Sequence, residues 1–183
     1  MDNNMIFKKV LFVSFNNVQT DSGLYALCAL ATYVRPYCEV LVADAIREDV
    51  YKIMDEFQPD LIAVPSYTFH FTELKEQAQK LKEYMPSIKL VIGGYHITSM
   101  PESVLNSPFD YAILGDGEET MRKLITGELI PTSKILPKNS VDINKIPVVD
   151  LPGLTPKENY AHGVAGMVTS RGCSFKCKYC AIR

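Results

Sequence analysis

The chain has 183 residues, of which 47% are hydrophobic and 22% are charged, a composition typical of globular proteins and not of disordered, collagen-like or coiled-coil chains. Its 19 Lys and Arg and 21 Asp and Glu give a formal charge of -2, which argues against a nucleic-acid-binding protein. The N-terminus MDNNMIFKKV lacks the features of a signal peptide, and no apolar run approaches the roughly 18 residues of a membrane span. We therefore expect a cytoplasmic protein with no membrane partner.

Five short apolar runs predict parallel strands that are buried on both faces. Each run is too short for a helix and lacks the alternation of a half-exposed strand. The runs are residues 10–13, 40–43, 61–64, 90–92 and 111–114. Apolar residues spaced by three and four over 46–57 and 71–85 predict helical crossovers. The alternation over 8–126 predicts a doubly wound α/β domain, for which the flavodoxin-like (Rossmann-like) strand order 2-1-3-4-5 is the natural five-strand choice.

The loops that follow these strands are the expected ligand-binding rim, because ligands of such sheets bind beyond the carboxyl ends of the strands. Small, hydroxyl and amide side chains are enriched there. The candidate contact residues are Ser14, Asn16, Ser66, Tyr67, Thr68, Gly93, Gly94, His96, Gly115, Gly117 and Glu118. For each loop taken alone, the alternative is that Gly and Ser only satisfy turn and cap geometry. Glu118 in particular is expected to be a helix-start carboxylate that faces the helix dipole.

The pattern changes after Gly127. We interpret residues 1–127 as one domain and 128–160, which are rich in proline, as a linker with short extended pieces. Residues 161–183 begin with an apolar run over 164–170 that could form one further strand. That run leads directly into the sequence RGCSFKCKYC.

Cys173, Cys177 and Cys180 form the most specific pattern in the chain, CxxxCxxC. Three thiolates on one loop can each hold one iron of a 4Fe-4S cluster and leave the fourth iron open. Zinc is the main alternative, but a structural zinc site needs four ligands, and the nearest histidine, His162, is 11 residues upstream. The CxxC pair alone could also be a redox motif, although its place near the end of the chain is unusual for one.

These motifs resemble those of the B12-dependent branch of the radical S-adenosylmethionine (SAM) superfamily. RGCSFKCKYC after a short strand is similar to the opening of a radical SAM barrel. The preceding region resembles the cobalamin-binding domain of that branch in residues 59–62, 66–68, 93–98 and 115–120, with 26 residues between Ser66 and Gly93. Loop 16–23 has no histidine, unlike the DxHxxG loop of methionine-synthase-type domains. The resemblance therefore implies base-off cobalamin binding without a protein histidine on cobalt.

The resemblance also implies roles for the motif residues. Cys173, Cys177 and Cys180 would hold the 4Fe-4S cluster, SAM would bind its open iron, and Tyr179 would pack near the adenine. The rim residues would bind cobalamin, with Ser66, Thr68, Gly93 and Gly94 on its nucleotide side. The complete enzyme would perform methyl transfer or a radical rearrangement.

The chain is expected to hold only the start of the barrel, since a barrel needs on the order of 200 residues. We therefore expect an enzyme portion that is not competent alone and that a partner chain or a second copy completes. The substrate is not indicated by the sequence. The alternative is a stand-alone cobalamin- or flavin-binding module with a vestigial or zinc-binding cysteine tail.

Overall fold

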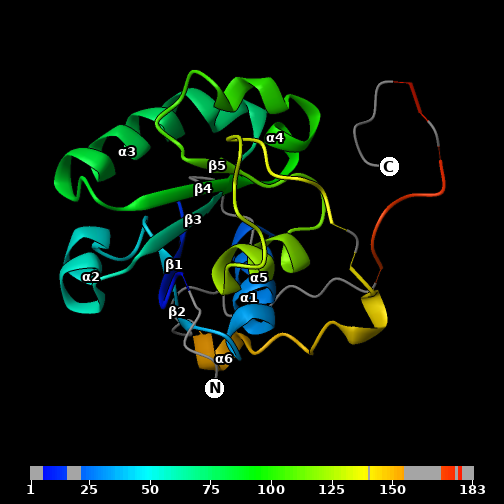
Figure 1. The fold of residues 1–183 in the computed structure, drawn as a ribbon, viewed down its shortest axis with the longest axis horizontal. Coiled ribbons are helices and arrows are strands. Elements are labelled where there is room, and N and C mark those ends of the chain that lie inside the picture. Colours follow the sequence, from blue (N-terminus) through cyan, green and yellow to red (C-terminus); the bar gives the residue numbers. More distant parts are fainter. Residues whose placement is uncertain (1–5, 16–21, 140, 155–169, 176, 179–183) are drawn as a thin grey trace.

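Five parallel strands form one sheet in the order β2-β1-β3-β4-β5 (Figure 1), and the predicted strand order is confirmed. The computed structural model describes residues 6–15, 22–139, 141–154, 170–175 and 177–178. The strands are β1 Lys9–Ser14, β2 Glu39–Asp44, β3 Leu61–Pro65, β4 Lys89–Gly93 and β5 Tyr111–Ala112. The fifth strand is shorter than the predicted run of 111–114. The carboxyl ends of β1, β3 and β4 lie at the same edge of the sheet.

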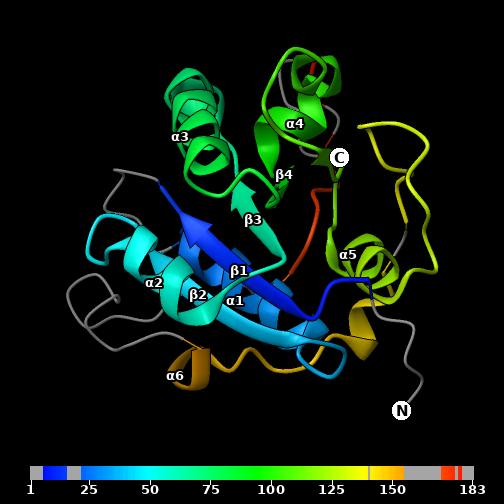
Figure 2. The same ribbon diagram turned by 60° about the vertical axis from the view of Figure 1, so that its left-hand side comes forward.

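Helices cover both faces of the sheet (Figure 2). One face carries α1 (Ser22–Val34), α5 (Glu118–Thr126) and the short α6 (Leu151–Leu154), and the other carries α2 (Val50–Phe57), α3 (Phe71–Tyr84) and the short α4 (Tyr95–Ser99). Three 3-10 turns, η1 (Thr68–His70), η2 (Pro101–Val104) and η3 (Ile143–Lys145), complete the described elements. Successive residues of β1 join opposite cores, which explains why its sequence shows no alternation of polar and apolar residues.

The predicted helical crossovers are present, with one difference at a helix start. The side chain of Asp49 accepts hydrogen bonds from the Tyr51 and Lys52 amides, so α2 begins at Val50. Ile46, which continues the apolar spacing, lies before this cap and is 53% exposed. The apolar spacing of α3 is confirmed, since its residues at positions 71, 74, 78 and 81 are all buried.

Asp110 joins α3 to the edge of the sheet. Its carboxylate accepts from Lys82 Nζ at 2.6 Å, from the Leu90 amide at 2.8 Å and from Lys89 Nζ at 3.2 Å. Burial alone would raise the pKa of Asp110, but the hydrogen bonds from Lys82, Leu90 and Lys89 outweigh it and hold the pKa below its ordinary value. The charged form of Asp110 therefore stabilises the fold.

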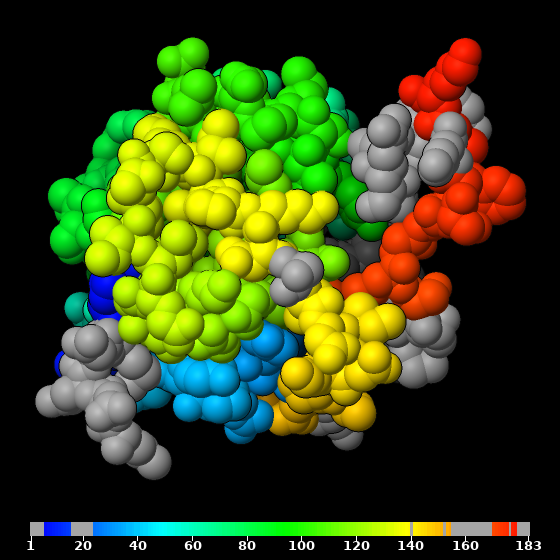
Figure 3. Space-filling view, turned by 45° about the vertical axis from the view of Figure 1, so that its right-hand side comes forward, coloured from blue at the N-terminus to red at the C-terminus, as the bar shows by residue number. Residues whose placement is uncertain are grey.

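The stretch that the proline-rich sequence suggested as a linker contacts the domain at several points. Ala112 donates its N–H to the Lys134 carbonyl at 2.7 Å, and Leu136 donates to the Ala112 carbonyl at 2.9 Å. Leu136 and Leu154 are buried in the core on the α1 and α5 side. Figure 3 shows residues 128–139, in yellow, lying across the surface next to α5.

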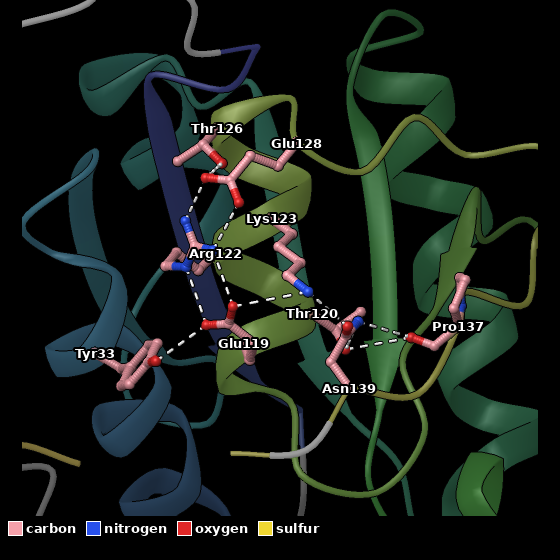
Figure 4. A network of polar contacts seen from close by, with 9 residues as sticks. All are labelled: Tyr33, Glu119, Thr120, Arg122, Lys123, Thr126, Glu128, Pro137 and Asn139. Carbon is pink, nitrogen blue, oxygen red and sulfur yellow. Dashed lines mark hydrogen bonds and ion pairs between the residues drawn. The ribbon is translucent and has the colours of Figure 1, made fainter. Parts of the chain in front are cut away.

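A polar network fixes α5 to its neighbours on both sides (Figure 4). Glu119 accepts hydrogen bonds from Arg122 and from the Tyr33 hydroxyl of α1, and the bonds from Arg122 hold the pKa of Glu119 below its ordinary value. Asn139 donates to Thr120 Oγ1 at 3.1 Å and accepts from Lys123 Nζ at 2.8 Å. The start of α5, which follows the last rim loop, is therefore held from both sides.

The described part of the chain contains no helix long and apolar enough to cross a membrane. The strand expected over 164–170 lies outside the described residues except for Ser170, and no barrel strand is present among the residues that the structure describes.

Candidate functional site

The junction of Ser66, Gly93 and Gly94 holds the ends of β3 and β4 together. The amide and the hydroxyl of Ser66 both donate to the Gly93 carbonyl, at 2.8 and 2.6 Å, and the His96 amide donates to the Ser66 carbonyl at 3.2 Å. Gly94 has a φ of 94°, and a Cβ on it would lie 2.8 Å from the Ser66 carbonyl oxygen. The Ser66 hydroxyl is therefore occupied within the chain, and it positions the two loops.

Gly93 differs from Gly94 because it has room around its Cα. A Cβ on Gly93 would meet its nearest described heavy atom, the Ile113 carbonyl oxygen, at 3.6 Å, an ordinary contact distance. The missing side chain leaves space at the carboxyl end of β4 that even a small residue would partly fill. A bulky ligand that approaches the strand ends needs this kind of space.

Exposed aromatic rings lie in the short segments that directly follow β3 and β4. Tyr67 has its ring centroid 5.8 Å from that of Phe69 and 5.9 Å from that of Tyr95. Phe69 is 69% exposed and Tyr95 is 56% exposed. Sequence reasoning selected Tyr67 and missed Phe69 and Tyr95. Both are aromatic residues that come just after a strand end and do not belong to the apolar spacing of a helix. That feature could have identified them.

Thr68 and His96 connect the segments that follow β3 and β4. Thr68 Oγ1 lies 3.2 Å from His96 Nδ1, and the imidazole stacks on Phe71 with centroids 4.1 Å apart. Burial lowers the pKa of His96, and the positive charge of Lys75 lowers it further. His96 is only 4% exposed, and its Nε2 has no hydrogen-bond partner among the described residues. The neutral ring therefore lies under the rim and not on its surface.

The loop after β5 is shaped by two glycines. Gly115 has a φ of 67° and donates its N–H to Thr98 Oγ1 at 3.0 Å, which ties this loop to α4. A Cβ on Gly117 would lie 3.2 Å from Leu30 of α1, so Gly117 permits the close packing of these two segments. Ser14, at the end of β1, is buried, and its carbonyl accepts from the Ala45 amide. Asn16 lies outside the described residues.

Glu118 is the first residue of α5, which confirms that it is a helix-start carboxylate. It is 3% exposed, and its Oε1 lies 2.5 Å from Arg171 Nη2. Arg171 Nη1 lies 3.4 Å from Asp116 Oδ1. Pairing with Glu118 raises the pKa of Arg171. A residue placed two positions before the first cysteine of the motif thus contacts the loop after β5.

Two of the three motif cysteines, Cys173 and Cys177, lie among the described residues. Cys173 is exposed and Cys177 is partly exposed, and both have free thiols. Cys180 and Tyr179 lie outside the described residues. No group of three metal-binding side chains is assembled within the described ranges, which omit Cys180. Figure 3 shows the described end of the chain, in red, extending from the main body.

The two other cysteines lie in a different environment. Burial, followed by the charge of Asp150, raises the pKa of the Cys28 thiol to about 12. Burial, followed by the charge of Glu39, raises the pKa of Cys38 to about 12. Both remain protonated thiols at neutral pH, and neither is suited to metal binding.

The structure therefore brings the loops after β3, β4 and β5 together at one edge. Residues 8–125 match the B12 binding domain family. The chain belongs to this family. The resemblance to cobalamin-dependent radical SAM proteins that the sequence motifs indicated is confirmed by its relatives.

Several curated relatives cover most of this chain, and two of them illustrate the match. An uncharacterized methyltransferase of Pyrococcus horikoshii is 29% identical over an alignment of 190 positions that includes 90% of this chain and 41% of that protein. The cobalamin-dependent radical SAM methyltransferase TokK of Streptomyces tokunonensis is 24% identical over an alignment of 206 positions that includes 94% of this chain and 30% of that protein. The chain thus spans less than half the length of either relative.

Among solved structures, the N-terminal domain of a hypothetical protein of Thermotoga maritima is 28% identical to this chain. The match has a TM-score of 0.43 and covers 67% of this chain and 92% of that chain.

Proposed function

We propose that this chain binds cobalamin at the carboxyl edge of its sheet, holds a 4Fe-4S cluster through Cys173, Cys177 and Cys180, and forms part of a radical SAM methyltransferase. The observation that carries this proposal is that one chain joins a B12-binding domain to a CxxxCxxC motif, with Arg171, just before the motif, paired to the rim loop. When bound, cobalamin would carry the methyl group, and the cluster would supply the electron that cleaves SAM.

The rim fits a large flat cofactor. Gly93 leaves room at the end of β4, and Phe69 and Tyr95, in the segments that follow β3 and β4, present exposed aromatic surface. Burying this apolar surface under a macrocycle would favour binding. Gly94 keeps the loops after β3 and β4 in contact, so the edge is already shaped before a ligand arrives. His96 is buried, which supports cobalamin binding without a histidine on cobalt from this loop.

The cysteine motif fits an iron–sulfur cluster by its donor set. Cys173 and Cys177 are free thiols that solvent can reach, and Cys180 supplies the third thiol of the motif. Three thiolates on one loop leave one iron for SAM. The substrate-binding part would come from sequence beyond these 183 residues, from a partner chain or from a second copy of this chain.

The test of the cluster is anaerobic reconstitution with iron and sulfide, read by visible absorbance and metal analysis. The variant with Cys173, Cys177 and Cys180 all replaced by Ala should lose iron uptake. Cys38→Ala is the matched control and should keep it, because Cys38 is a protonated, half-buried thiol outside the motif. Equal iron loading in the triple variant would overturn the cluster, and zinc binding by that motif in place of iron would favour a structural site.

The test of the rim uses hydroxocobalamin and the Gly93→Val variant. A valine would fill the space at the end of β4, so cobalamin affinity should fall by about tenfold or more, while Gly93→Ala should have a smaller effect. Both variants should fold normally. A folded Gly93→Val protein that binds cobalamin as tightly as the parent would show that the cofactor does not use this edge. Tight flavin binding without cobalamin binding would favour the alternative module.

A further inference from the structure

Arg171 provides the contact that places the start of the cysteine loop. Its guanidinium reaches two carboxylates of the loop after β5, Glu118 at 2.5 Å and Asp116 at 3.4 Å. Glu118 lies 53 residues before Arg171 in the sequence. Among the described residues, the polar contacts between 170–178 and the rest of the domain all involve Arg171.

The two members of this ion pair depend on each other. The Glu118 side chain is 4% exposed and the Arg171 side chain is 28% exposed. A buried carboxylate without a cation is strongly unfavourable, and in the described chain Arg171 is the cation that Glu118 pairs with. The guanidinium contacts Glu118 through Nη2 and Asp116 through Nη1, so one planar group bridges the two carboxylates, which a single ammonium point charge is less suited to do. The pair is therefore a specific contact between two distant segments and not a chance meeting of surface charges.

The connection from this pair to the first cysteine is short. Only Gly172 separates Arg171 from Cys173, so the Cys173 Cα lies within about 8 Å of the Arg171 Cα. Gly172 has a φ of 77°. A Cβ added to it would meet no heavy atom within 4 Å, so packing does not impose this turn. Cys173 and Phe175 are exposed, and the described loop has no buried contact of its own. Fixing Arg171 therefore confines Cys173 to a region within about 8 Å of the Arg171 Cα.

We infer that Glu118 and Arg171 are a positioning pair that holds the cysteine loop against the loop after β5. This inference rests on the proposed function: the ion pair would set the distance between a cluster bound by the motif and a cofactor bound at the rim. The loop 115–118 then serves two purposes: it borders the rim, and it carries the carboxylate that holds Arg171. A cofactor that orders this loop would also order the cysteine loop, and the effect is reciprocal.

The first experiment is limited proteolysis of the cofactor-free chain with chymotrypsin, read by mass spectrometry. In Glu118→Gln and Arg171→Gln, cleavage after Phe175, a side chain that is 73% exposed, should be about fivefold or more faster than in the parent, while β1 and β3 remain uncleaved. Arg35→Gln is the matched control, because Arg35 pairs with Asp150 at 2.7 Å far from the rim loop. Cleavage after Phe175 at the parental rate in both variants would overturn the inference. Arg171 belongs to neither core, so its variant remains informative if Glu118→Gln fails to fold.

The second experiment measures the distance between the two cofactors. Reduced cluster and cob(II)alamin are both paramagnetic, so their dipolar coupling reports how far apart they lie. The parent should show a defined coupling, and Arg171→Gln should keep both cofactors but lose or broaden it, with partial recovery in Arg171→Lys. An unchanged coupling at full cofactor loading would refute a positioning role. If the parent binds no iron or no cobalamin, the proposed function fails, while the proteolysis experiment still decides whether the pair holds the loop.

Discussion

Replacing Gly94 by Ala tests whether this glycine is required by the fold and not by a ligand. Its φ of 94° belongs to the left-handed region, where a residue with a Cβ is strained by about 1–2 kcal/mol. The new Cβ would also lie 2.8 Å from the carbonyl oxygen and 2.9 Å from the nitrogen of Ser66, closer than van der Waals contact allows. Both contacts are with backbone, so the strand ends must move apart.

That movement would weaken the hydrogen bonds that Ser66 donates to the Gly93 carbonyl and the one that its own carbonyl accepts from the His96 amide. Each of these bonds contributes about 1 kcal/mol. Backbone strain and one lost hydrogen bond together give a destabilisation of about 2–3 kcal/mol. For a chain of this size, each kcal/mol corresponds to about 2–4 °C in Tm, so the midpoint should fall by about 4–12 °C.

The assay is urea unfolding followed by circular dichroism, with thermal unfolding as a second measurement. Gly93→Ala is the matched control, since its Cβ would meet its nearest described neighbour at 3.6 Å and its φ is not in the left-handed region. It should change the free energy of unfolding by less than about 1 kcal/mol. Equal losses in the two variants, or a Gly94→Ala protein as stable as the parent, would refute the reasoning.

Three further predictions concern other parts of the molecule. Leu136→Ala should lower the free energy of unfolding by about 2–4 kcal/mol while Ile130→Ala, at a side chain that is 76% exposed, leaves it nearly unchanged, which urea unfolding can check. With pKa values raised to about 12, Cys28 and Cys38 should resist iodoacetamide in the native protein at pH 8, whereas the exposed cysteines of the motif react, as peptide mass spectrometry would show. Asp110→Asn should destabilise the protein by about 1.5–3 kcal/mol at pH 7. Because the folded-state pKa of Asp110 is depressed, its contribution is full above the unfolded pKa of about 4 and is lost as the pH falls through the folded value, so parent and variant should converge in acid.

The sheet could be predicted from the sequence because its strands are buried on both faces. Residues such as those of β1 alternate between two apolar cores, so each strand reads as a continuous apolar run. Local chemistry moved some boundaries. The apolar spacing extends back to Ile46, but the cap by Asp49 makes α2 begin at Val50. β5 has only two residues, and the residue after it, Ile113, retains one hydrogen bond to Ile92.

The packing of residues 128–154 could not be predicted, because their prolines and weak periodicity give no sign of tertiary contact. Leu136 reaches the core through a single parallel bridge beside β5, and Leu154 does so from a helix of four residues. Neither element is long enough to produce a repeating apolar pattern. Isolated apolar residues in such a stretch look the same in the sequence whether they are buried or exposed.

The location of the candidate site could be predicted, but the use of its side chains could not. Strand ends identify the rim loops by a general rule of parallel sheets. Whether the Ser66 hydroxyl faces a ligand or its own chain depends on the neighbouring strand, 27 residues away in the sequence. The pairing of Glu118 with Arg171 spans 53 residues and follows no periodicity. Such contacts arise from tertiary structure, and a motif contains no information about them.

Gly93 and Gly94 show how a fold requirement and a ligand requirement can be separated at one site. Gly94 is needed before any ligand binds, because its backbone angle and its contact with Ser66 exclude a side chain. Gly93 meets neither condition, so the fold alone would accept alanine there. Loss of cobalamin binding in a stable Gly93→Val protein therefore indicates steric exclusion of the ligand, whereas the same loss in Gly94→Ala would follow from distorted loops. If the cofactor binds at this edge, its affinity should fall as the side chain at position 93 grows from alanine to valine, while the fold stays stable. If it binds elsewhere, its affinity should not depend on the size of that side chain.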